Sequence, residues 1–145
     1  MSISKKVLII EDNLDIRENI VEILELSGYM VYATDNGEMG IALALQNLPD
    51  IILCDIMMPE MDGYGVLALL NNQPQMMAIP FVFLTAKSEG LDLRRGMESG
   101  ANGYLVKPFD DTDLLNVIEK QIKIENWRES LLPMSGVMGC KRAGG

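Results

Sequence analysis

Short apolar runs recur along most of the chain, and each ends close to a polar residue. Their β-branched and aromatic residues, and the turn residues that flank them, are typical of buried strands. The stretches between them repeat apolar residues at helical spacing. Strands that alternate with helices predict an α/β fold, in which right-handed crossovers place helices on both faces of a parallel sheet. The predicted strands are residues 6–10, 30–33, 51–55, 81–84 and 104–106.

A helical segment is predicted after each strand. The first carries Ile16, Ile20 and Leu24 on one face. Gly28 is expected to close it, because glycine suits the left-handed backbone that ends many helices. The segment 89–99 is more polar than the others, so we expect it to be held less securely. The remaining helical segments are residues 36–48, 64–70 and 110–124.

The length and composition suit one globular domain. The chain has 145 residues, of which 48% are hydrophobic, and this is enough for a single core. Its apolar runs are too short to span a bilayer, and residues 1–6 lack the apolar segment of a secretory signal, so we expect a cytoplasmic protein without a membrane span. Cys54 and Cys140 form neither a CxxC motif nor a disulfide framework, and Cys54 is expected to be a small core residue.

Charge and histidine content exclude several functions. A formal net charge of -9 argues against nucleic-acid binding by this chain, because phosphate contacts need clustered lysine and arginine. The chain has no histidine, which excludes Ser-His-Asp and Cys-His catalysis, histidine-ligated zinc and a phosphohistidine of its own. Carboxylates, hydroxyls and amines must therefore carry its chemistry.

The carboxyl ends of the predicted strands gather the candidate chemical groups. Glu11 and Asp12 follow the first strand, and Asp55 ends the third. Thr85 ends the fourth strand and Lys107 ends the fifth. Parallel strands bring these ends to one edge, where ligands bind in open α/β sheets. Three carboxylates would repel one another there unless cations compensate, and a divalent ion with oxygen ligands, together with the lysine, is the expected solution.

Mg²⁺ is the cation that this group of residues predicts, because it is usually held by one or two carboxylates and keeps several waters. Asp12 and Asp55 are expected to bind it directly. Glu11 would act through a bound water, and the backbone carbonyl of Met57 would complete the shell. Acids in these positions can also stabilise the start of the following helix, and the two roles are compatible.

Asp55 is the candidate reactive residue. A strand-end aspartate can simply cap the turn or helix that follows, but the neighbouring groups favour a chemical role. The carboxylate would attack a phosphoryl group and form an aspartyl phosphate. The phosphoryl oxygens would be neutralised or hydrogen-bonded by Mg²⁺, the Lys107 ammonium and the Thr85 hydroxyl. The acids Glu60 and Asp62, in the turn after this strand, are expected to be solvated.

Four segments carry a specific set of motifs when they are taken together, in order and at compatible spacing. They are VLIIEDN (residues 7–13), DIILCDIMMPEMDG (50–63), FLTA (83–86) and GYLVKPF (103–109). Over residues 6–124 the chain resembles the receiver domain of a two-component response regulator, of the chemotaxis-receiver type. The resemblance implies a flavodoxin-like, doubly wound sheet of five parallel strands in the order 2-1-3-4-5, with five helices.

The resemblance also implies a signalling function. Asp55 would accept a phosphoryl group from a sensor histidine kinase or a histidine phosphotransfer protein, and the chain would catalyse only its own phosphorylation and dephosphorylation. Phosphorylation in the family draws the hydroxyl at Thr85 toward the phosphoryl group and turns the aromatic at Tyr104 inward. The face made by the fourth helix, fifth strand and fifth helix would then bind a downstream output protein or domain, or a second copy in a homodimer. The Lys107–Pro108 peptide bond is expected to be cis.

Domain boundaries and rival functions remain open at this level. Residues 4–126 are expected to form the receiver domain, and residues 127–145 a largely disordered C-terminal extension, linker or expression tail. The chain is therefore either a stand-alone receiver or one part of a longer regulator or hybrid kinase. One rival is an aspartate-based phosphohydrolase, although Met57 stands where such enzymes commonly have a second acid. The other rival is a constitutive interaction module that turns over no phosphate.

Overall fold

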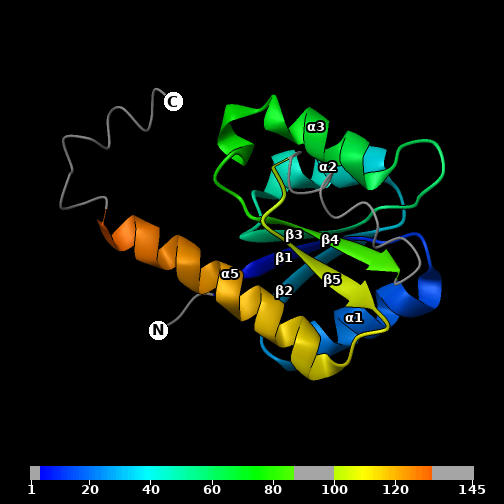
Figure 1. Ribbon diagram of the computed structural model, residues 1–145, viewed down its shortest axis with the longest axis horizontal. Helices are drawn as coiled ribbons and strands as arrows, with labels where there is room; N and C mark the ends of the chain where they lie inside the picture. The colour runs from blue at the N-terminus through cyan, green and yellow to red at the C-terminus, as the bar shows by residue number, and fades with distance from the viewer. Residues whose placement is uncertain (1–3, 87–99, 132–145) are drawn as a thin grey trace.

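The sheet has the predicted topology. The computed structural model describes residues 4–86 and 100–131, with side chains in the last helix described as far as residue 124. Within these residues five parallel strands lie in the order β2-β1-β3-β4-β5, which confirms the flavodoxin-like fold (Figure 1). Each strand contains the apolar run that predicted it. The strands are β1 (Lys6–Ile10), β2 (Met30–Thr34), β3 (Ile51–Asp55), β4 (Phe81–Ala86) and β5 (Gly103–Lys107).

The helices begin where polar side chains can cap them. The Oδ1 atom of Asn13 accepts a hydrogen bond from the Ile16 amide at 2.9 Å, and so satisfies one of the free amides at a helix start. The predicted segment 89–99 lies outside the described residues. A single 3-10 turn, Pro74–Met76, was not predicted. The helices described are α1 (Leu14–Leu26), α2 (Gly37–Asn47), α3 (Gly63–Asn71) and α5 (Asp111–Leu131).

Two hydrophobic clusters hold these helices against opposite faces of the sheet. Figure 1 shows α1 and α5 on one side and α2 and α3 on the other. Successive strand residues point to opposite faces, so Ile9 and Leu53 join the cluster under α1 and α5. Ile10 and Cys54 join the cluster under α2 and α3. Burial on both faces explains why the central strands have nearly continuous apolar sequences.

Helix α5 is longer than the pattern of apolar residues predicted. It was expected to end at residue 124, but it continues to Leu131. Residues 125–131 contain neither glycine nor proline, and the first helix-breaking residue is Pro133. The predicted boundary between residues 126 and 127 thus falls inside a helix, and the rest of the predicted tail, from residue 132, lies outside the described residues. Of the helices that the structure describes, α5 included, none has the length and apolar character needed to cross a membrane.

Candidate functional site

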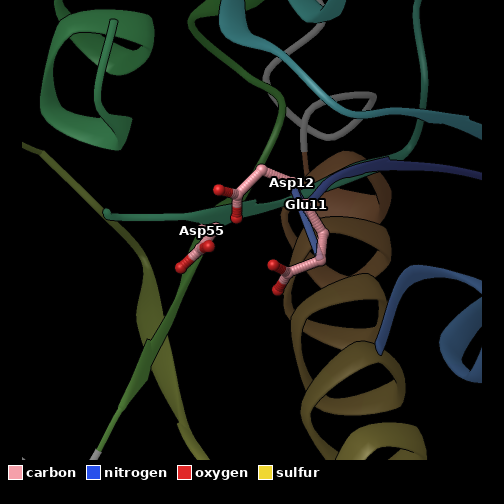
Figure 2. A group of neighbouring side chains, drawn as sticks. All are labelled: Glu11, Asp12 and Asp55. Carbon is pink, nitrogen blue, oxygen red and sulfur yellow. The ribbon is translucent and has the colours of Figure 1, made fainter. Parts of the chain in front are cut away.

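Three carboxylates meet where β1 and β3 end. Ile10 pairs with Cys54 in the ladder between these neighbouring strands, so the residues that follow each, Glu11 and Asp55, are adjacent at the edge of the sheet. Asp12 comes next on the β1 side, and one carboxylate oxygen from each of the three acids lies within 4.8 Å of the others. Figure 2 shows the three side chains gathered at this point. The predicted acidic cluster is therefore formed.

The three acids differ in exposure and in their partners. Asp12 is exposed, whereas the exposed fraction of Asp55 is 4% and that of Glu11 is 0%. Both oxygens of Glu11 have partners: Oε1 lies 2.7 Å from the ammonium of Lys107, and Oε2 accepts the Asn13 amide at 3.1 Å. Glu11 is thus held in place by protein groups, while Asp12 faces solvent.

Lys107 bridges the two buried acids from the end of β5. Besides its ion pair with Glu11, its Nζ atom lies 3.3 Å from Oδ1 of Asp55. The Lys107–Pro108 peptide bond is cis, as predicted. Burial by itself would lower the pKa of Lys107, but the hydrogen bond with Glu11 and the charges of Asp55 and Glu11 outweigh it and raise this pKa above its usual value. The lysine is therefore a fixed positive charge in the site.

The pKa of the Asp55 carboxyl group is strongly raised. Burial is the largest cause, and the hydrogen bond and negative charge of Glu11 add to it, while Lys107 acts in the opposite direction. Together they raise the pKa of Asp55 from 3.8 to about 8. Two of the three carboxylates, those of Glu11 and Asp55, contact the Lys107 ammonium, and all the donor atoms of the three acids are oxygens. A hard divalent cation fits this donor set, because it favours ionised carboxylates and oxygen ligands.

Thr85 and Tyr104 lie on the two strands beyond β3. Thr85 follows Leu84, the register partner of Asp55, and its buried hydroxyl donates to the carbonyl of Ala86 at 3.3 Å. Tyr104 is half-buried, and the centroid of its ring lies 6.1 Å from that of Phe83 on β4. The strand order places the hydroxyl at the edge that carries the acids, and the tyrosine against the aromatic core on the α2 and α3 side.

The loop after β3 brings the start of α3 back against the main chain of Asp55. Met57 is 59% exposed, and its carbonyl stays a predicted ligand. Gly63 at the start of α3 lies so close that an added Cβ would stand 2.5 Å from the main-chain oxygen of Asp55. Asp62, expected to be solvated, is half-buried, and its Oδ1 caps α3 by accepting the Gly65 amide at 2.9 Å. The Asp-Gly pair before an apolar segment was a usable signal for this cap.

Arg17 was not identified as a site residue from the sequence. Its Nη1 atom donates to the main-chain oxygen of Glu11 at 2.8 Å. An arginine one turn into an amphipathic helix usually looks like a solvated residue, and no spacing rule links it to the preceding strand. The long side chain folds back to the β1–α1 junction, which only the three-dimensional structure reveals.

The fold and the site together define a flavodoxin-like α/β domain that carries an oxygen-ligand site and a buried aspartate at the carboxyl edge of its sheet. The comparisons give the family. The family model "Response regulator receiver domain" matches residues 7–119, and the chain belongs to this family. Receiver domains are signalling switches of two-component systems, which work with histidine kinases and output domains.

Relatives of two kinds resemble the chain. It is 35% identical over 113 residues to protein PilH of Pseudomonas aeruginosa, across 78% of this chain and 93% of that protein. It is 39% identical over 132 residues to the transcriptional regulatory protein HprR of Escherichia coli, across 91% of this chain and 58% of that protein. The chain spans about half the length of five curated transcriptional regulators that it matches, from 42% to 60%.

A solved structure agrees with this assignment. The chemotaxis response regulator CheY4 of Vibrio cholerae superposes with a TM-score of 0.78 at 30% identity, and the match covers 82% of this chain and 99% of that one. The predicted chemotaxis-receiver-like fold is confirmed.

Proposed function

We propose that this chain accepts a phosphoryl group on Asp55 from a sensor histidine kinase or a histidine phosphotransfer protein, with Mg²⁺ bound, in the cytoplasm. Phosphorylation would then change the face that binds a downstream protein or domain. One observation carries the proposal: Asp55 is a buried carboxyl group that lies 3.3 Å from a fixed ammonium and within 4.8 Å of two further acids. Few structural roles require a buried carboxyl group with two further acids and an ammonium so close to it.

The proposed metal ligands follow from the contacts of each acid. Asp12 is exposed and Asp55 ends its strand, so both can turn an oxygen to a cation. Glu11 already contacts Lys107 and the Asn13 amide, which suits an indirect contact through water. The carbonyl of Met57, in the loop after β3, is the proposed further ligand. When bound, Mg²⁺ supplies positive charge to these carboxylates and to the oxygens of the phosphoryl group.

The transfer step uses the chain's own groups. One carboxylate oxygen of Asp55 forms a bond to phosphorus while the bond from phosphorus to the donor imidazole breaks, and its electron pair returns to the imidazole nitrogen. Lys107 can hydrogen-bond a phosphoryl oxygen from its position 3.3 Å from Oδ1. Thr85 can do the same once its hydroxyl leaves the Ala86 carbonyl. The chain thereby catalyses only its own phosphorylation and, with water, its own dephosphorylation.

A groove beside the site gives the donor protein room to approach. It has a volume of about 620 Å³ and lies next to Lys107, between the start of α1 and the loop after β5. The apolar residues in its lining and its position beside Lys107 suit a protein surface that must bring a phosphohistidine within bonding distance of Asp55. The groove is lined by Asp15, Ile16, Asn19, Ala86, Lys107, Pro108 and Phe109.

The proposed switch connects the phosphoryl group to the β5 face. Movement of the Thr85 hydroxyl would open space beside β4, and Tyr104, already against Phe83, would turn further inward. Val106, exposed to 42%, lies on the same strand. This face, with α5 and the segment predicted as the fourth helix, would bind an output partner or a second copy of the chain.

Incubation with acetyl phosphate and Mg²⁺, followed by intact mass measurement, tests this function. The wild type should gain the mass of one phosphoryl group, and neither Asp55→Ala nor the chelator-treated wild type should do so. Equal gain in wild type and variant would refute the proposal. Steady turnover of a phosphate ester in excess over protein would instead support the phosphohydrolase.

A further inference from the structure

Arg17 ties the start of α1 to the end of β1. Its main-chain amide donates to the Asn13 oxygen at 2.9 Å, as expected within the first turns of a helix. Its side chain turns back and donates from Nη1 to the Glu11 oxygen at 2.8 Å. Arg17 is half-buried, so this charge-assisted hydrogen bond is shielded from much of the solvent. The residue acts on the backbone of the site and not on its carboxylates.

The carbonyl that Arg17 holds belongs to the peptide unit joining Glu11 to Asp12. The orientation of that peptide determines the direction in which the Asp12 side chain leaves the chain. The amide of Glu11 is fixed on the opposite side by the Thr34 oxygen at 3.0 Å. Asp12, which is exposed and lies two residues beyond the end of β1, therefore depends on Arg17 for the rigidity of the peptide that precedes it.

We propose that Arg17 is a positioning residue for the metal site, and that its hydrogen bond to the Glu11 carbonyl holds Asp12 in the orientation that binds a divalent cation. This inference rests on the proposed Mg²⁺ role of Asp12. The charge of Arg17 has the opposite effect to its hydrogen bond. A cation near the site weakens binding of a second cation, so removing the charge alone would strengthen Mg²⁺ binding, while releasing the peptide would weaken it.

The test measures Mg²⁺ affinity of the full chain by titration calorimetry. Arg17→Met keeps an apolar stem and removes both the charge and the donors. Its dissociation constant for Mg²⁺ should rise about tenfold, the effect expected from losing one charge-assisted hydrogen bond. Arg17→Lys keeps the charge and a donor group but has a shorter side chain. Its dissociation constant for Mg²⁺ should lie between those of the wild type and Arg17→Met.

Lys6 offers a matched control. Its Nζ atom donates to the Asn47 oxygen at 2.9 Å, so Lys6→Met also removes one cation and one side-chain bond to a carbonyl, but at the opposite edge of the sheet. Lys6→Met should lower stability without changing Mg²⁺ affinity. In phosphorylation by acetyl phosphate, Arg17→Met should need more Mg²⁺ for half-maximal rate and reach the wild-type rate when Mg²⁺ saturates.

Each result decides the question. Unchanged or tighter Mg²⁺ binding by Arg17→Met would overturn the inference, even if its melting temperature fell, because the residue would then serve stability or charge alone. Loss of affinity equal to that of Lys6→Met would also overturn it. Failure of the wild type itself to bind Mg²⁺ would refute the proposed function and, with it, this role.

Discussion

The polar and charged groups at the two edges of the sheet are paired in different ways. At the amino edge the amide of Lys6 donates to Oδ2 of Asp50 at 2.7 Å, and the amide of Asp50 donates back to the Lys6 oxygen at 2.8 Å. At the carboxyl edge Glu11, Asp12 and Asp55 lie together, and the Lys107 ammonium, the cation that contacts them among the described residues, pairs with Glu11 and Asp55. The amino edge pairs its polar groups with each other, whereas the described part of the carboxyl edge gathers three acids around one ammonium.

This difference distinguishes polar groups that stabilise the fold from polar groups that are available to bind a ligand. Polar groups that only stabilise a fold are paired within the protein, as Lys6 and Asp50 are. Two of the acids at the other edge, Glu11 and Asp55, are buried, and burial together with the neighbouring Glu11 raises the pKa of Asp55 to about 8. The domain therefore gives up stability at the carboxyl edge, and a bound cation should restore it.

The largest expected difference between the edges is in the stability lost when the lysine at each edge is replaced. Lys107→Met leaves the fully buried carboxylate of Glu11 without the cation 2.7 Å away, and should lower the free energy of unfolding by about 3 kcal/mol. Lys6→Met removes a bond to a carbonyl and should lower it by about 1 kcal/mol. Urea unfolding near neutral pH with a chelator measures both, and equal losses would show that the edges do not differ.

Asp55→Asn should act in the opposite direction, by stabilising the metal-free domain. Because the folded pKa of Asp55 is raised from 3.8 to about 8, its contribution to stability is complete below about pH 4 and is lost as the pH rises through 8. At pH 8.5 the variant should exceed the wild type by on the order of 2 kcal/mol, and the gap should close toward pH 5.

The control for this variant is Asp50→Asn at the amino edge. It keeps an oxygen that can accept the Lys6 amide and should change the free energy of unfolding little at pH 8.5. Urea unfolding at several pH values measures the curves. Parallel curves for wild type and Asp55→Asn would contradict the pKa shift.

Mg²⁺ should stabilise the carboxyl edge alone. At millimolar concentrations it should raise the free energy of unfolding of the wild type by about 1 kcal/mol, because it binds only the folded site. Asp12→Asn should lose most of that increase, and Asp50→Asn should keep it. Thermal unfolding with and without Mg²⁺ gives the comparison, and an equal increase in all three proteins would point to a nonspecific salt effect.

The smallest effect concerns one strained residue at each edge. Glu60, in the loop beside Asp55, has a φ of 71°, and Leu48, at the end of α2, has a φ of 48°. Glycine adopts such angles without strain, so Glu60→Gly should raise stability by about 0.5–1 kcal/mol. Leu48→Gly should raise stability less, because the half-exposed Leu48 side chain makes apolar contacts that the substitution removes. Melting temperatures would rank the two, and a destabilised Glu60→Gly would disprove the strain.

The sequence predicted the architecture because burial makes this pattern strong. Runs such as residues 51–55 are buried on both faces and so consist of apolar residues up to Asp55. Once the strands were placed, their carboxyl ends predicted that Glu11, Asp55 and Lys107 lie close together, since a parallel sheet brings these ends to one edge. The motifs added the strand order and the cis Lys107–Pro108 bond.

Other features depended on contacts that no local pattern encodes. The Arg17 side chain reaches back to Glu11 across a turn, and its direction is set by packing. Asp62 is different: it was expected to be solvated, although the Asp-Gly pair before an apolar segment could have indicated the cap that it makes for α3. The end of α5 was placed too early because the apolar pattern weakens before the helix does, and helix formers without a breaker can continue it.

Locating the phosphoryl group tests the central claim most directly. The chain would be phosphorylated with acetyl phosphate and Mg²⁺, reduced with borohydride, which converts an aspartyl phosphate to homoserine, and sequenced by peptide fragmentation. The account predicts homoserine at position 55 and at no other position. Homoserine at Asp12 or another aspartate, or its absence from a chain that had gained phosphoryl mass, would contradict it.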